Sequence, residues 1–345
     1  MTRLLALAAA VGMVVGALAL RGDAPGRAGG DGGRGAEGPL RLTCAAELAT
    51  ACQALADGRE DLQVTVEEAG HTADRLAAAS AADVTDDGWM VPAPWPQLVE
   101  EARGRAGSPP LLDHTGPVLA RTPLVVAVWS DRSEVLATSC QPDVGWRCIG
   151  EMAGRPWSEV GGQEAWGPVK PVVPDPVTTT VGLFTLGQAT ATYHGRADLS
   201  RADLDDDGYR DWLGSLAGGL VHPPDPSLQA MLPFGRARFD LVATTEASAQ
   251  PLVERAARAE GLVLLDFEPV ATADVVLATR RDDRRATMLA DLVGGSDGLA
   301  ALAGAGWRLA GDGPAATPRP GLPDGNGLPS PGVLEALRSA WQEVA

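Results

Sequence analysis

The chain has 345 residues, of which 45% are hydrophobic and 21% are charged, and its formal net charge at pH 7 is -17. This length and composition fit a globular protein with one bilobed unit or two ordinary domains, and they exclude a fibrous or disordered chain. The acidic balance excludes nucleic acid as a partner, because phosphate binding requires clustered cations and the sequence contains no basic stripe.

The N-terminus has the pattern of an export signal. Arg3 precedes an apolar run over residues 4–20, and Arg21 follows it. Residues 1–21 are therefore expected to be a signal peptide or an N-terminal membrane anchor, and both alternatives stay open because the run is close to the shortest that spans a bilayer. The first cysteine, Cys44, lies too far along to carry a lipid anchor. We expect an extracellular or cell-surface protein whose membrane contact is made through this segment.

Beyond a flexible linker at 22–38, short β-branched runs alternate with alanine-rich runs. In chain order, the expected strands are 39–43, 62–68, 88–95, 122–129, 169–176, 238–245, 262–269 and 273–279. The expected helices include 45–56, 71–81, 96–106, 181–193, 246–261, two ending near 308, and 333–344. This alternation predicts an α/β protein with parallel sheets and right-handed crossovers.

The break and resumption of the pattern indicates two lobes. We expect residues 39–121 and 246–310 to form lobe 1, and residues 122–245 to form lobe 2. Residues 311–345 are expected to be a Gly/Pro-rich tail that ends in a terminal helix.

Four cysteines in an exported chain predict two disulfides, and their spacing favours the local pairs Cys44 with Cys52 and Cys140 with Cys148. Three connectivities remain open. The second pair brackets a turn-rich loop at 141–145. Cys44 must lie outside the helix that contains Cys52, because eight helical residues rise about 12 Å, whereas bridged Cα atoms lie roughly 4.4 to 6.8 Å apart. No CxxC or HxxxH spacing occurs, so we expect no metal site.

Motifs of enzyme chemistry are missing from the sequence. The histidines His71, His114, His194 and His222 are far apart, and none lies in a nucleophile elbow, an HExxH helix or a triad context. We expect a protein that is not an enzyme and has no cofactor.

An acidic run at 203–208 imitates the start of an EF-hand loop. The twelfth position of such a loop is Gly214 here instead of the bidentate glutamate that calcium requires. The run is therefore interpreted as an acidic turn that caps a helix over 209–220.

Trp89 and Trp95 flank the sequence MVPAP, where the third expected strand ends. Two roles stay open for these side chains. They could stack on a sugar or cover an apolar group of a ligand, or they could pack in the core.

The order of the segments resembles bacterial extracellular solute-binding proteins, and most of all the molybdate/sulfate-type branch of the periplasmic binding protein superfamily. The resemblance covers about residues 39–310 and rests on LRLTCAAEL, EEAGHTADRL, AADVTDDGWMVPAPWPQLVEEA, ARTPLVVAVW, VVPDPVTTTVGLFTLGQA, FDLVATTEA and LLDFEPVATADVVLATRRDD. It implies a two-lobed, periplasmic-binding-protein-like type II fold with two hinge crossings, near 118–126 and 241–246.

The same resemblance implies a function. Such a protein captures a small polar solute in an interlobe cleft by hinge closure, as a monomer, for an ABC-type transporter, with a membrane permease or a neighbouring membrane subunit as partner. By position in the fold, the expected ligand-binding residues are Thr43, Thr72, Trp95, Thr178, Thr180, Thr245 and Glu246. Thr72, Thr180 and Thr245 also stand where a helix N-cap would be expected.

Two departures from the branch affect the expected ligand. The first helix turn offers Thr43, Cys44 and Ala45 in place of the hydroxyl pair of oxyanion binders, and Glu246 would repel a dianion. We therefore expect a cationic or hydroxyl-rich solute. The alternative is a membrane-tethered interaction or sensing module without a transport role, which the missing lipid anchor and the C-terminal tail favour. A polar cleft would favour transport, and a filled apolar cleft would favour the module.

Overall fold

The computed structural model describes residues 38–255, 257–281, 283–310, 322 and 325–344. The expected signal or anchor at 1–21 and nearly all of the expected linker lie outside these residues. Within the described ranges, no helix combines the length and the apolar character that crossing a bilayer requires.

The strands follow the sequence pattern closely. They are β1 (Leu40–Ala45), β2 (Leu62–Glu67), β3 (Gly88–Ala93), β4 (Leu112–Asp113), β5 (Ala120–Trp129), β6 (Pro171–Val172), β7 (Leu241–Thr245), β8 (Leu262–Leu265), β9 (Thr272–Arg280) and β10 (Arg308–Leu309). The strand expected at 169–176 shortens to β6, because Pro171, Pro174 and Pro176 lack the amide hydrogen of a sheet ladder.

The helices account for most of the remaining chain. The α-helices are α2 (Ala49–Ala56), α3 (Ala69–Ala78), α4 (Trp95–Arg105), α5 (Ser130–Ser139), α6 (Trp146–Met152), α7 (Thr180–His194), α8 (Asp207–Gly219), α9 (Leu228–Met231), α10 (Glu246–Arg255), α11 (Arg284–Gly294), α12 (Ser296–Gly304) and α13 (Pro331–Val344). The 3-10 helices are η1 (Ala46–Leu48), η2 (Trp157–Val160), η3 (Glu164–Trp166), η4 (Arg201–Asp205), η5 (Leu232–Ala237) and η6 (Ala257–Ala259).

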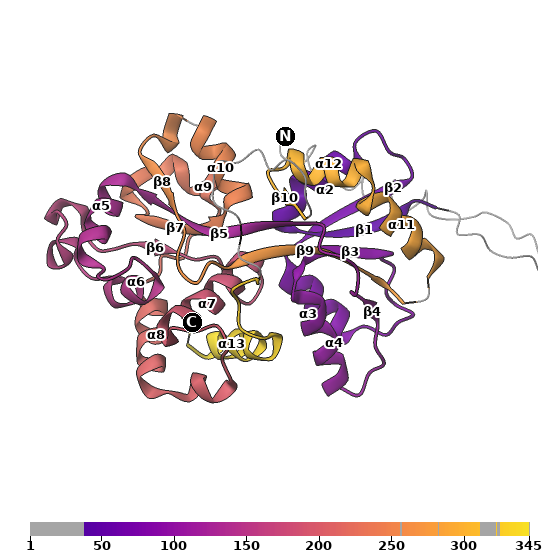
Figure 1. Ribbon diagram of the computed structural model, residues 1–345, viewed down its shortest axis with the longest axis horizontal. Coiled ribbons are helices and arrows are strands. Elements are labelled where there is room, and N and C mark those ends of the chain that lie inside the picture. The colour runs from indigo at the N-terminus through magenta and orange to yellow at the C-terminus, as the bar shows by residue number, and fades with distance from the viewer. Residues whose placement is uncertain (1–37, 256, 282, 311–321, 323–324, 345) are drawn as a thin grey trace, which may run out of the picture. The chain divides into compact units, whose positions relative to one another are not determined.

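The strands are joined through β5 into the order β2-β1-β3-β9-β5-β7-β6. The first part of β5 pairs with β9 and β10, and its last part pairs with β7 and β8. We call β1, β2, β3, β4, β9, β10 and the first part of β5 strand group A, and β6, β7, β8 and the rest of β5 strand group B. Figure 1 shows β5 and β9 running side by side between the two groups. The α/β prediction is confirmed.

The second passage between the groups lies later in the chain than expected. Residues 241–246 form β7 and the start of α10, and both pack beside the group B part of β5. The strand β8 also pairs with that part of β5, so the chain returns to group A between β8 and β9. The expected parallel pairing holds for β1 with β2 and β3 and for β6 with β7, whereas β5 and β9 pair antiparallel with their neighbours.

Both expected disulfides are present. Cys44 in β1 is bridged to Cys52 in α2 with their Cα atoms 6.6 Å apart, and Cys140 is bridged to Cys148 at 5.6 Å. The local pairing is therefore confirmed, as is the position of Cys44 before the helix. The acidic turn also has its expected role, because the Asp206 carboxylate accepts a hydrogen bond from the Tyr209 amide at the start of α8.

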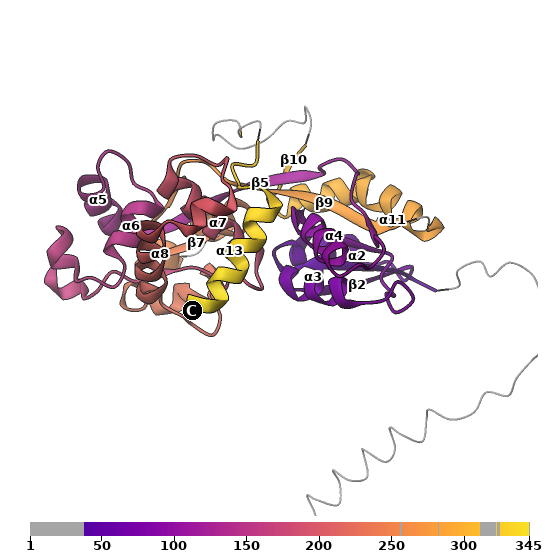
Figure 2. The same cartoon turned by 90° about the horizontal axis from the view of Figure 1, so that it is seen from below.

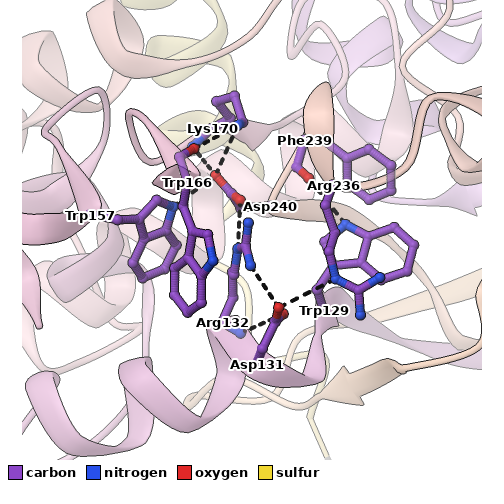
Figure 3. Close-up of polar contacts among 9 residues, drawn as sticks. All are labelled: Trp129, Asp131, Arg132, Trp157, Trp166, Lys170, Arg236, Phe239 and Asp240. Carbon is purple, nitrogen blue, oxygen red and sulfur yellow. Dashed lines mark hydrogen bonds and ion pairs between the residues drawn. The ribbon is translucent and has the colours of Figure 1, made fainter. Parts of the chain in front are cut away.

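A buried polar network holds group B together around Asp240, whose side chain is 0% exposed (Figure 3). Its Oδ1 accepts a hydrogen bond from Arg132 Nε at 3.0 Å, and its Oδ2 accepts one from Trp157 Nε1 at 3.0 Å and one from the Lys170 amide at 2.8 Å. The Arg132 guanidinium also stacks 3.8 Å from the ring centre of Trp166. The network joins α5, η2, η3 and the residues just before β6 and β7, because each partner comes from a different segment.

Substituting Asp240→Asn is expected to lower the free energy of unfolding by about 3 kcal/mol, because it leaves only the partly exposed Asp131 to balance the buried Arg132 charge. Urea denaturation of the oxidised protein measures this change. The control is Asp205→Asn, since Asp205 is 71% exposed and pairs with the exposed Arg210, so its loss is expected to cost less than about 1 kcal/mol. Equal effects of the two substitutions would contradict the assigned role of Asp240.

Candidate ligand-binding interface between the strand groups

Strands β1, β2 and β3 are parallel, so their carboxyl ends lie at one edge of group A. Each of them runs directly into a helix, namely η1, α3 and α4. Helix N-termini with free amides therefore gather at this edge, as in the crevices where α/β folds bind ligands. Opposite them stand the loop 173–179 and the first turn of α7, which follow β6 of group B.

The two groups touch through polar contacts at this edge. The Gly70 amide of α3 donates to the Thr178 carbonyl at 2.8 Å, and the buried Trp95 Nε1 of α4 donates to Thr180 Oγ1 at 3.0 Å. The approach at Gly70 is close, because a Cβ atom there would lie 2.3 Å from the Val177 carbonyl oxygen. Only glycine permits this contact.

Glu47 of η1 lies in the same contact region. Burial raises the pKa of Glu47 to about 7, although a hydrogen bond with the Thr180 side chain opposes the rise. The residue as a whole is half-buried, but its Oε1 is buried and has no hydrogen-bond partner among the described residues. An unpaired buried carboxyl oxygen is costly, so it marks a position that favours a hydrogen-bond donor.

Further carboxyl groups act on Glu68, whose charge in turn acts on Glu47. Burial raises the pKa of Glu68 at the start of α3, His71 lowers it, and Asp225 and Asp175 raise it further. Asp175 belongs to the loop before α7, so like charges from both groups face one another. The interface is therefore polar and acidic.

The structure brings three of the expected ligand-binding residues together, namely Trp95, Thr178 and Thr180. Thr72 lies within α3 and its hydroxyl donates to Glu67 at 2.6 Å. Thr43 is buried in β1, and its Oγ1 has no hydrogen-bond partner among the described residues. Neither Thr72 nor Thr180 is an N-cap, since these positions belong to Glu68 and Thr179.

Thr245 and Glu246 lie apart from this cluster, at the start of α10. Thr245 does act as an expected cap, because its Oγ1 accepts a hydrogen bond from the Ser248 amide at 3.2 Å. The Glu246 carboxylate is buried and accepts hydrogen bonds from Arg308 Nε at 2.9 Å and Nη2 at 3.0 Å. Its charge is therefore balanced by a guanidinium of the same chain.

The sequence reasoning missed Glu47, Glu68, Asp74 and Arg338. Glu47 could have been found, because it follows the first strand at the same edge as Thr43. Asp74 and Arg338 carried no local signal, since they meet across 264 positions of the chain.

No group of three or more His, Cys, Asp or Glu side chains in the described part of the chain has the geometry of a metal site. A pocket of about 420 Å³ lies in group A between β9 and α11, and residues such as Leu119, Thr279 and Ala290 line it. None of the expected ligand-binding residues lines this pocket.

Comparisons with known proteins support the fold. No protein-family model matches the chain, and no curated protein matches it. Among solved structures, iron-bound HitA from Pseudomonas aeruginosa has a TM-score of 0.61 at 14% identity, covering 89% of this chain and 99% of HitA. The fructose-6-phosphate-bound binding protein AfuA from Actinobacillus pleuropneumoniae has a TM-score of 0.59 at 14% identity, covering 89% of this chain and 98% of AfuA. A periplasmic thiamin-binding protein has a TM-score of 0.57 at 14% identity, covering 91% of this chain and 99% of the thiamin-binding protein.

These likenesses establish a periplasmic-binding-protein-like fold for the described part of the chain, as the sequence predicted. The three proteins carry the names of unrelated solutes, so they do not single out the molybdate/sulfate branch.

The raised pKa of Glu47 predicts a specific dependence of stability on pH. The folded protein keeps a proton that the unfolded chain releases, so the free energy of unfolding falls as pH rises from about 4.5 to about 7 and levels off above. Glu47→Gln removes this contribution. The free energy of unfolding of the variant, relative to that of the wild type, should therefore rise across that window by at most roughly 3 kcal/mol. Urea denaturation at a series of pH values measures the difference. A difference that does not change with pH would contradict the burial of an ionisable group at Glu47.

Proposed function

We propose that the chain is an exported solute-binding protein that holds a small cationic or hydroxyl-rich solute between its two strand groups. Groups A and B serve as the two lobes, and closure bends β5 and the segment between β8 and β9. In this proposal the second lobe extends to residue 265 instead of 245, because β8 pairs with the group B part of β5. Delivery of the solute to an ABC-type transporter is part of the proposal and is supported by the likeness to periplasmic binding proteins.

The observation that carries the proposal is the Glu47 carboxyl group at the contact between the groups, with one buried oxygen that lacks a hydrogen-bond partner. A carboxylate in this position favours a cation or a hydroxyl donor, whereas an anion would add a like charge in a desolvated interface. Glu68 and Asp175 act in the same direction. These groups, and not the Arg308-paired Glu246, are proposed to set the charge of the solute.

One observation favours the second candidate, an interaction module without a transport role. Helix α13 packs against α4, which follows β3 of group A, and against α7, which follows β6 of group B. A helix that joins both groups would keep them together and present them to a neighbouring subunit as one surface. The two candidates differ in whether the two groups move apart and close again around a solute.

A thermal-shift screen distinguishes these candidates. Amines, guanidines, sugars, amino acids and oxyanions would each be added to the full-length protein, and we expect stabilisation by cations or polyols and none by molybdate or sulfate. A ligand at about 100 times its dissociation constant contributes roughly 2.7 kcal/mol to stability. Binding of a cation should tighten as pH rises toward about 7, because Glu47 loses its proton over this range, and should level off above it.

Glu47→Gln is the test variant for the solute found, and it should weaken binding of a cation at least about tenfold through the lost charge pair. The matched control is Glu134→Gln, which removes the same charge from an exposed position on α5. If the best ligand is an oxyanion, or if Glu47→Gln leaves the affinity unchanged, the proposed role of Glu47 is wrong.

Closure itself can be tested at Gly70. In Gly70→Ala the new Cβ would clash with the Val177 carbonyl oxygen, so the groups should remain further apart and small-angle scattering should give a larger radius of gyration. Gly104→Ala in α4 is the control, because a Cβ atom there meets nothing within 4 Å. A Gly70→Ala variant as compact as the control, with unchanged ligand binding, would show that this contact does not control closure.

A further inference from the structure

Helix α13 lies along the boundary between the two strand groups. Figure 2 shows it between α7 and α4, and it packs against both. Its apolar face is buried through Val333, Leu334, Leu337 and Trp341. The fit against α7 is close, because a Cβ atom on Gly187 would lie 2.7 Å from Leu334 Cδ2. The apolar face therefore fixes the direction in which the polar side chains of α13 point.

Arg338 of α13 reaches the contact between the groups, and its guanidinium is bound from three sides. Its Nη1 and Nη2 donate to the two Asp74 carboxylate oxygens at 2.8 Å each, and its Nε donates to the Val177 carbonyl at 2.7 Å. The guanidinium carbon lies 5.5 Å from the ring centre of Trp95. A carboxylate fork, a carbonyl and an aromatic face together form a recognition set for a planar guanidinium.

The recognition set is assembled from both strand groups. Asp74 and Trp95 stand on α3 and α4 of group A, whereas Val177 belongs to the loop before α7, on the group B side. Trp95 also donates to Thr180, and the residue next to Val177 accepts the Gly70 amide, so the set adjoins the proposed solute interface directly. The Asp74 side chain is 61% exposed, so a guanidinium in solution can reach it.

We infer that Asp74, Trp95 and Val177 form a guanidinium-binding subsite, that Arg338 is its tethered occupant, and that the solute carries a guanidinium group that competes with Arg338. This inference rests on the proposed function, whose solute class it narrows. Because Arg338 is attached to the chain, it competes for the subsite at a high effective concentration. A free guanidinium compound must therefore displace Arg338 before it binds. A lysine side chain or a simple amine lacks the planar fork and fits this subsite less well.

The test compares the full-length wild type with Arg338→Gln by isothermal titration calorimetry, with arginine, agmatine, lysine and cadaverine as probes. Arg338→Gln should bind arginine or agmatine at least about tenfold more tightly than the wild type, because the competitor is gone. The lysine and cadaverine affinities should change much less. Adding Asp74→Asn to Arg338→Gln should abolish the gain, because the carboxylate fork is lost.

The control variant is Arg105→Gln. Arg105 of α4 forms an ion pair with Glu335 of α13 at 3.2 Å, and the Arg105 side chain is 49% exposed. This substitution loosens α13 without emptying the subsite, so the affinity for agmatine should remain that of the wild type. If Arg338→Gln does not fold, Arg338→Lys gives the same comparison, because it keeps the charge and the stem but lacks the fork.

The outcomes separate this inference from the proposed function. If another cation binds the wild type through Glu47 and Arg338→Gln does not alter guanidinium affinity, the tethered-occupant inference is overturned and the proposed function stands. If Arg338→Gln gains affinity for agmatine and Asp74→Asn removes it, the inference holds. If polyols bind but no cation does, the inference is overturned and the proposed function stands. If neither a cation nor a polyol binds any of the variants, both are overturned.

Discussion

The pairing of a single strand with two sets of partners is the constraint on which the rest of the structure depends. The strand β5 is ten residues long, and Pro123 stands where its pairing changes from β9 to β7. A proline cannot donate a ladder hydrogen bond, so it fits a position at which one ladder gives way to the next. Among the described residues, the chain passes from one strand group to the other in β5 and in the segment between β8 and β9. In the proposed closure, movement of one group relative to the other therefore bends these two segments.

The sequence predicted the elements of the fold better than their arrangement. Apolar and β-branched runs located β1, β2, β3, β5, β7, β8 and β9, since these patterns report local burial. The predicted parallel pairing holds for β1 with β2 and β3 and for β6 with β7, but not for β5 and β9, because the partners of β5 and β9 come from distant parts of the chain. The run LVLL at 262–265 illustrates the limit. Its composition identifies a strand, but nothing in it indicates that it extends group B instead of returning to group A.

The candidate site was predicted in part for the same reason. Trp95, Thr178 and Thr180 were found because they stand at strand ends and helix starts, which are positions that a chain pattern reveals. The charges were harder to assign. Glu246 has the position of a ligand-binding carboxylate, but Arg308 neutralises it, and that partner is 62 residues away. Burial and ion pairing between distant segments decide which carboxyl groups remain available to a ligand, and a single sequence does not contain that information.

The two disulfides have a consequence for how the protein acquires its covalent structure. Each joins cysteines eight positions apart, and each lies within one part of the fold, Cys44 with Cys52 beside β1 and Cys140 with Cys148 beside α6. The entropy lost on closing a loop grows with its length, so these short loops close more readily than any of the mixed pairings. Oxidation of the unfolded chain should thus yield the native pairs directly, without shuffling by an isomerase. Neither bridge links the two strand groups, so oxidation places no covalent restraint between them.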